Sequence, residues 1–205
     1  MKKKTIMVLF IFVLLLTVAC GKKTSDHSNE TVTDPVSKNI KYVMSASWTG
    51  YRNIEDIAIK SDIIAQIKVK EITNPVEINR ANGISMYSTY FVVSVDKLLY
   101  GEETGDIRIC MTGAYDTDGN VISEIDDDPL MKVGEEYLIF ARKNTDGSFT
   151  ILSGPSGRFV VREGRVYSNW IKYHGNPDDF YDLSDGAEYD EFVDRVSKAK
   201  KKTDN

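Results

Sequence analysis

The stretch Asp62–Ile72, DIIAQIKVKEI, contains the pattern that decides the fold. Apolar residues occupy every second position, and lysines and a glutamine lie between them. Because successive side chains of a β-strand point to opposite faces, this period of two predicts a strand with one buried face. The residues on the predicted buried face are Ile63, Ala65, Ile67 and Val69.

Further strands are predicted towards the C-terminus. Tyr87–Tyr100 (YSTYFVVSVDKLLY) and Glu136–Arg142 (EYLIFAR) are both typical of strands. Shorter strands are predicted at 107–111, 114–115, 121–122, 149–152, 158–162 and 165–167, with turns at Gly101–Gly105, Asp118-Gly119, Asp146-Gly147 and Glu163-Gly164. Short strands at nearly regular spacing predict a mainly β fold, either a sandwich or a closed or partly open antiparallel barrel.

Two helices are expected beside these strands. Ile54–Lys60 has apolar residues at helical spacing. Near the C-terminus, Asp185 is the predicted N-cap and Glu188 the acid three positions later. The apolar stripe that follows consists of Tyr189, Phe192, Val193 and Val196. We therefore predict a C-terminal amphipathic α-helix that covers one mouth or one face of the barrel.

The first twenty residues have the order of a bacterial lipoprotein signal. Met1–Lys4 is basic, Thr5–Ala19 is an uncharged apolar run, and Cys20 follows. A basic start before an apolar run of this length is typical of a secretory signal. Leu16–Cys20 (LTVAC) resembles the lipobox of bacterial lipoproteins. The resemblance implies cleavage before Cys20, a diacylglyceryl group on Cys20, and anchoring at the extracytoplasmic face of the cell membrane.

The chain has 205 residues, with 26 Lys and Arg, 31 Asp and Glu, and a formal charge of −5. Cleavage would remove three lysines and leave a charge of −8. This acidic balance argues against nucleic-acid binding, which needs a concentrated basic face. Two cysteines cannot form a disulfide scaffold, and with Cys20 lipidated Cys110 is the only free cysteine.

Four parts are predicted along the chain. They are a signal peptide at 1–19, the lipidated cysteine and a flexible tether at 20–50, a barrel domain at 51–170, and a loop with the C-terminal helix and a basic tail at 171–205. The tether is predicted because Gly21–Lys41 is polar and nearly without large apolar side chains.

Four segments of the barrel domain carry a family resemblance. They are Ser61–Ile67 (SDIIAQI), Tyr90–Gly101 (YFVVSVDKLLYG), Val133–Phe140 (VGEEYLIF) and Gly154–Phe159 (GPSGRF). Together they are similar to bacterial secreted lipoproteins whose core resembles the OB-like barrel of tissue inhibitors of metalloproteinases and netrin modules. The resemblance covers about residues 62–167 and implies an OB-like barrel.

Few residues offer catalytic chemistry. His174 is the only histidine outside the tether, and Cys110 lies in a strand, where a buried or half-buried thiol is expected. The sequence contains no HExxH, G-x-S-x-G, Walker or GxGxxG pattern. We therefore predict no catalytic residue and no cofactor.

Two groups of residues are candidates for binding. Between Glu102 and Glu136 the sequence contains eleven acidic residues and only two basic ones. Such a group of carboxylates either holds Ca²⁺ or forms a solvated loop. The calcium candidates are Asp116, Asp118, Asp126, Asp127 and Asp128. Ring-bearing side chains could instead stack on a glycan or peptide or pack at the barrel ends. The stacking candidates are Trp48, Tyr167, Trp170, Tyr173 and Tyr181. The ligand-binding candidates are Trp170, Tyr173 and His174.

These observations predict a lipid-anchored, extracytoplasmic binding or interaction module. Its partner would be an envelope protein, a peptide or a glycan, and not a nucleic acid. One alternative is an envelope hydrolase or metal-dependent enzyme, which needs His174, Cys110 or the acidic loop to converge in one pocket. A second alternative is an inhibitor of a secreted protease.

Overall fold

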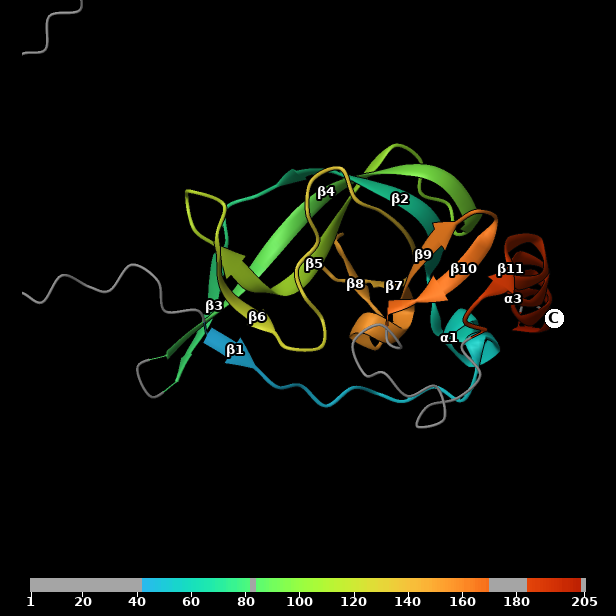
Figure 1. The fold of residues 1–205 in the computed structure, drawn as a ribbon, viewed down its shortest axis with the longest axis horizontal. Coiled ribbons are helices and arrows are strands. Elements are labelled where there is room, and N and C mark those ends of the chain that lie inside the picture. Colours follow the sequence, from blue (N-terminus) through green and yellow to red (C-terminus); the bar gives the residue numbers. More distant parts are fainter. Residues whose placement is uncertain (1–41, 82–83, 170–183, 204–205) are drawn as a thin grey trace, which may run out of the picture. The chain divides into compact units, whose positions relative to one another are not determined.

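A computed structural model of the chain describes residues 42–81, 84–169 and 184–203 (Figure 1). The fold is mainly β, with a closed five-strand barrel and a C-terminal helix, as the sequence predicts. In chain order the elements are β1 (Tyr42–Met44), α1 (Ile54–Lys60), β2 (Ile63–Ile72), β3 (Val76–Ala81), β4 (Ile84–Tyr100), β5 (Asp106–Tyr115), β6 (Val121–Ile125), β7 (Glu136–Lys143), β8 (Phe149–Ile151), the 3-10 helix η1 (Gly154–Gly157), β9 (Arg158–Arg162), β10 (Arg165–Ser168), β11 (Ala187–Glu188) and α3 (Tyr189–Thr203).

The barrel is closed by strands β2, β4, β5, β8 and β7. β2 pairs with β4 and β7, β4 pairs with β5, and β8 pairs with both β5 and β7. The last of the five strands in the chain thus lies between the third and the fourth, an arrangement compatible with an OB-like fold. The strands are not all antiparallel as predicted, because β8 runs parallel to β5 and β1 runs parallel to β6.

Strands β2 and β7 have buried residues on both faces. The alternating residues predicted from the sequence, from Ile63 to Val69, lie in the inner core of the barrel. Ile64 and Phe140 point to the opposite face, where they pack with Ile57 of α1 and Phe192 of α3. Two cores therefore share one wall, one inside the barrel and one between the wall and the helices.

Helix α3 begins four residues after the predicted N-cap. The carboxylate of Asp185 does not cap the helix but accepts a 2.7 Å hydrogen bond from the backbone N–H of Ser168. Ala187–Glu188 pairs with β10 as strand β11, so the helix begins at Tyr189. Strand pairing thus replaces the local capping pattern, and the helix covers a face of the barrel.

Besides β11, two strands appear where the sequence predicts none. β3 forms a hairpin with β4, with a register shift between Glu77 and Asn79. β1 lies inside the range predicted as tether and pairs with β6, from Tyr42 opposite Ser123 to Met44 opposite Ile125. A strand of three residues is too short to show an alternating pattern.

The packed cores lie well inside the chain. All of their residues, including the partly buried ones packed against them, fall between Trp48 and Ala199. A soluble form comprising residues 21–205 therefore keeps every one of these contacts. Among the described residues, no helix combines the length and the apolar composition needed to span a bilayer.

Replacing Phe192 with alanine should strongly destabilise the protein. Its ring is fully buried and packs edge-to-face on Phe140 and Phe159, with centroid distances of 6.1 and 5.3 Å. Losing a buried phenylalanine costs about 3–5 kcal/mol of unfolding free energy, which urea titration of residues 21–205 would measure. The control Lys202→Ala changes an exposed residue of the same helix and should stay within about 0.5 kcal/mol of the natural protein. Equal stabilities of the two variants would show that α3 is not packed as described.

Candidate functional site

A groove of about 1000 Å³ lies at one end of the barrel, where β2 ends and where β5 turns into β6. We call it the mouth groove. Its apolar lining residues are Ile72, Pro75, Tyr115, Val121 and Val133. Thr73, Asn74, Thr117, Asp116 and Lys132 supply polar groups, and Gly119 completes the lining. A large concave surface with an apolar lining and a few polar groups is the usual form of a ligand site.

The floor of the mouth groove is continuous with the inner core. Tyr115 belongs to that core, and Ile72 and Val121 are partly buried against it. Val133, in contrast, is 59% exposed. The alternating apolar side chains that fill the barrel thus continue, at this end, into apolar side chains that line the mouth groove.

A segment between β6 and β7 crosses this end of the barrel and is anchored in the core. Leu130 and Met131 are buried there. Gly113 of β5 makes room for the segment, because a Cβ atom at this position would lie 2.7 Å from the Ser123 carbonyl oxygen and 3.1 Å from a methyl carbon of Leu130. Gly113 also has a φ of +135°, which a residue with a side chain rarely adopts.

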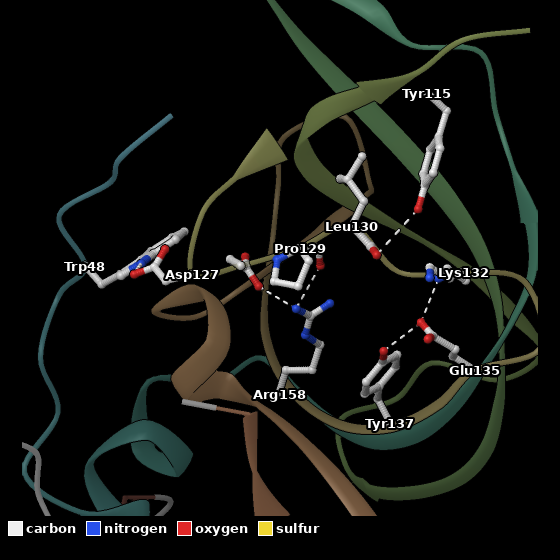
Figure 2. A network of polar contacts seen from close by, with 10 residues as sticks. Trp48, Tyr115, Asp127, Pro129, Leu130, Lys132, Glu135, Tyr137 and Arg158 are labelled. Carbon is white, nitrogen blue, oxygen red and sulfur yellow. Dashed lines mark hydrogen bonds and ion pairs between the residues drawn. The ribbon is translucent and has the colours of Figure 1, made fainter. Parts of the chain in front are cut away.

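Polar side chains hold the same segment from two sides, with Tyr115 on one side and Glu135 and Tyr137 on the other, as Figure 2 shows. The Tyr115 hydroxyl donates to the carbonyl oxygen of Met131 at 3.0 Å. The Glu135 carboxylate accepts 2.7 Å hydrogen bonds from the Lys132 backbone N–H and from the Tyr137 hydroxyl. Burial, aided by nearby carboxylates, raises the pKa of Tyr115 to about 12, so its hydroxyl remains a neutral donor at physiological pH.

Arg158, at the start of β9, is the fully buried cation of this network. Its Nη2 donates to Asp128 at 2.7 Å and to the Pro129 carbonyl oxygen at 3.0 Å. The guanidinium also lies 5.1 Å from the centroid of the Tyr137 ring. In Figure 2 its Nη1 points to the side of Lys132 and Glu135, and in the described part of the chain neither Nη1 nor Nε has a hydrogen-bond partner. Within the described residues, the buried guanidinium therefore uses only one of its three nitrogens in hydrogen bonds.

Asp128 is buried opposite Arg158. Desolvation raises the pKa of Asp128 to about 6; Arg158 opposes this shift and the neighbouring Asp127 adds to it. Asp127 itself accepts a 2.9 Å hydrogen bond from the indole N–H of Trp48. The pair Asp127–Asp128 thus connects β9 and the chain after β1 to one loop.

The structure does not bring the five calcium candidates together. Asp116 closes the β5–β6 turn by accepting the backbone N–H groups of Asp118 and Asn120, and the Asn120 bond is the main cause that lowers the pKa of Asp116. Asp127 and Asp128 are engaged with Trp48 and Arg158, and Asp126 is exposed. In the described ranges no group of three or more His, Cys, Asp or Glu side chains could hold a metal ion.

The other predicted candidates have different outcomes. Trp170, Tyr173 and His174 lie outside the described residues. Cys110 is half-buried on β5, as predicted. The sequence analysis missed Lys132 and Arg158, and the only available signal for Arg158 was a charge beside the apolar run of β9.

No protein-family model matches the chain, and no curated protein matches it. The assignment of the site therefore depends on the geometry of the mouth groove and of the network beneath it.

Replacing Asp128 with asparagine should change how stability depends on pH. In the folded protein the pKa of Asp128 is about 6, against an ordinary value of 3.8, so the folded state binds more protons between these values. Raising the pH from about 4.5 to about 7.5 should therefore lower the unfolding free energy of the natural protein relative to Asp128→Asn, by about 2 kcal/mol.

Urea unfolding of both proteins at the two pH values measures this difference. The pH-independent cost of removing the carboxylate from Arg158 cancels when the two pH values are compared. A difference that stays constant, or that shifts in favour of the natural protein as pH rises, would contradict the burial of an ionisable Asp128.

Proposed function

We propose that this chain is a lipid-anchored binding module at the extracytoplasmic face of a bacterial cell membrane, and that the mouth groove is its ligand site. The observation that carries the proposal is the groove itself. Its volume of about 1000 Å³ matches the upper range of ligand sites, and its floor is the apolar end of the barrel core. An envelope protein, a peptide or a glycan is the proposed class of partner, and no catalysis is proposed.

The order of residues at the N-terminus supports the membrane anchor. A basic start, an apolar run and the LTVAC segment precede Cys20. A diacylglyceryl group on Cys20 would provide two acyl chains, which suffice for stable anchoring because each buried CH₂ contributes about 0.8 kcal/mol. Residues 21–41 would then separate the lipid from the first described strand.

The barrel supports a kinship with netrin modules and tissue inhibitors of metalloproteinases, which we also propose. The placement of β8 between β5 and β7 is compatible with an OB-like fold. The segments that carry the resemblance include much of β2, β4 and β7, which form three neighbouring strands of the wall. Protease inhibition is not part of this proposal.

The ligand site can be tested by NMR. Residues 21–205, labelled with ¹⁵N, would be titrated with peptide and glycan fractions of a bacterial envelope. The amides that shift should be those of 72–75, 115–121 and 132–133. Val133→Asp should remove the response, whereas the control Val43→Asp alters a valine of similar exposure, 55%, outside the groove lining and should retain it. Shifts confined to another surface, or an unaltered response of Val133→Asp, would refute the groove as the ligand site.

Replacing Cys20 with alanine should abolish lipidation. The natural protein, expressed in a bacterium, should be recovered in the membrane fraction with a diacylglyceryl-modified Cys20 at its N-terminus. Cys20→Ala should lack the modification, and Cys110→Ala should keep it, because Cys110 lies within β5. Mass spectrometry of the extracted proteins gives the answer. A natural protein with any other mature N-terminus would exclude the proposed anchor.

A further inference from the structure

The floor of the mouth groove is suited to hydrocarbon. Ile72, Tyr115 and Val121 continue the inner core, and the exposed Val133 adds to their apolar surface. The Tyr115 hydroxyl is already used, because it donates to the Met131 carbonyl oxygen. That hydroxyl is therefore not available to a ligand. A floor of this kind favours an alkyl chain over a sugar, which needs hydrogen-bond partners.

The charges of the groove differ in whether they are already satisfied. Asp116 accepts hydrogen bonds from Asp118, at 2.9 Å, and from Asn120, at 2.8 Å to the backbone N–H and 3.1 Å to the side chain. The nearby Glu135 accepts two hydrogen bonds of 2.7 Å, from Tyr137 and from the backbone of Lys132. Both carboxylates are therefore engaged by donors of the protein.

The Lys132 ammonium, in contrast, is not engaged by other groups in the described part of the protein. Its side chain is exposed and lines the groove, and in the described part of the chain it has neither a hydrogen-bond nor an ion-pair partner. Among the described residues that line the groove, Lys132 and Asp116 carry the charged side chains. The charged group of the lining without a partner among the described residues is thus a cation, which is complementary to an anionic head group.

We propose that the mouth groove binds a medium-chain fatty acid, with its alkyl chain on Ile72, Tyr115 and Val121 and its carboxylate at the Lys132 ammonium. This inference rests on the proposed function, which assigns ligand binding to the groove, and it names the chemical class of the ligand. Each methylene that enters the groove removes apolar surface from water, and the head group fixes the orientation of the chain.

Calorimetric titration of residues 21–205 tests the alkyl chain. Octanoate, decanoate and dodecanoate would be added below their micellar concentrations. Affinity should rise about fourfold per methylene until the groove is filled. Val133→Asp should weaken the binding of decanoate at least tenfold, because it places a carboxylate beside the chain, whereas Val43→Asp should leave it unchanged.

The head group is tested by comparing decanoate with neutral decanol. Lys132→Gln should weaken decanoate about two- to fivefold, as expected for an exposed ion pair, and leave decanol unchanged. The matched control Lys202→Gln removes an exposed lysine of α3 and should affect neither ligand. Raising the salt concentration from about 0.05 M to about 0.5 M should reduce the preference for decanoate.

Two results would overturn the fatty-acid proposal. One is equal binding of decanoate and decanol to the natural protein, and the other is decanoate binding that Val133→Asp leaves intact. The proposed function has a separate criterion, since a peptide or glycan that shifts the amides of the mouth groove would support it even then. The two failures are therefore distinguishable.

Discussion

The double burial of β2 and β7 is the constraint on which the rest of the structure depends. Ile63 and Ile139 point into the barrel, whereas Ile64 and Phe140 point outwards to the helices. If a strand that is buried on both faces shifted its register by one residue, the side chains of each core would move into the other core. The register of the barrel wall is therefore fixed. In Figure 1, α1 and α3 lie at the opposite end of the view from β3 and β6, where the mouth groove is found. The helices cover the wall and leave that end of the barrel open.

The main effect of the polar network beneath the groove is to position the chain, and the network adds little to the free energy of unfolding. Arg158 and Asp128 are both buried, and such a pair gains little net free energy because both charges lose their hydration. The guanidinium uses only Nη2 in hydrogen bonds within the described residues. The pair does fix where the chain crosses the barrel end, while Leu130 and Met131 supply the apolar anchorage. Lys132, one residue later, is thereby brought to the groove.

The sequence predicted those parts of the fold that are encoded locally. Alternation identified β2, β4 and β5, an apolar run identified β7, and glycine-containing turns identified the hairpins, because each signal depends on neighbouring residues. The parallel pairing of β5 with β8 joins strands distant in the chain and leaves no local pattern. The N-cap at Asp185 was wrong for a related reason, since pairing of Ala187–Glu188 with β10 overrode a valid capping sequence. The mouth groove was missed because its lining comes from three separate parts of the chain, around Ile72, Tyr115 and Lys132.

The charged groups of the mouth groove could likewise not be predicted from local sequence patterns. Between Glu102 and Glu136 the sequence is strongly acidic, which directs attention to cations. In the structure, many of these carboxylates are engaged one at a time: Glu103 with Lys143, Asp106 with Lys70, Asp128 with Arg158, Glu136 with Lys68, and Asp116 with the donors of its own turn. Their partners come from other strands or from backbone groups, which composition does not record. An engaged carboxylate offers a ligand much less than a free one, so the net charge of a segment does not give the sign of its binding site. At the mouth groove, the residue without a partner among the described residues is a lysine inside a strongly acidic part of the chain.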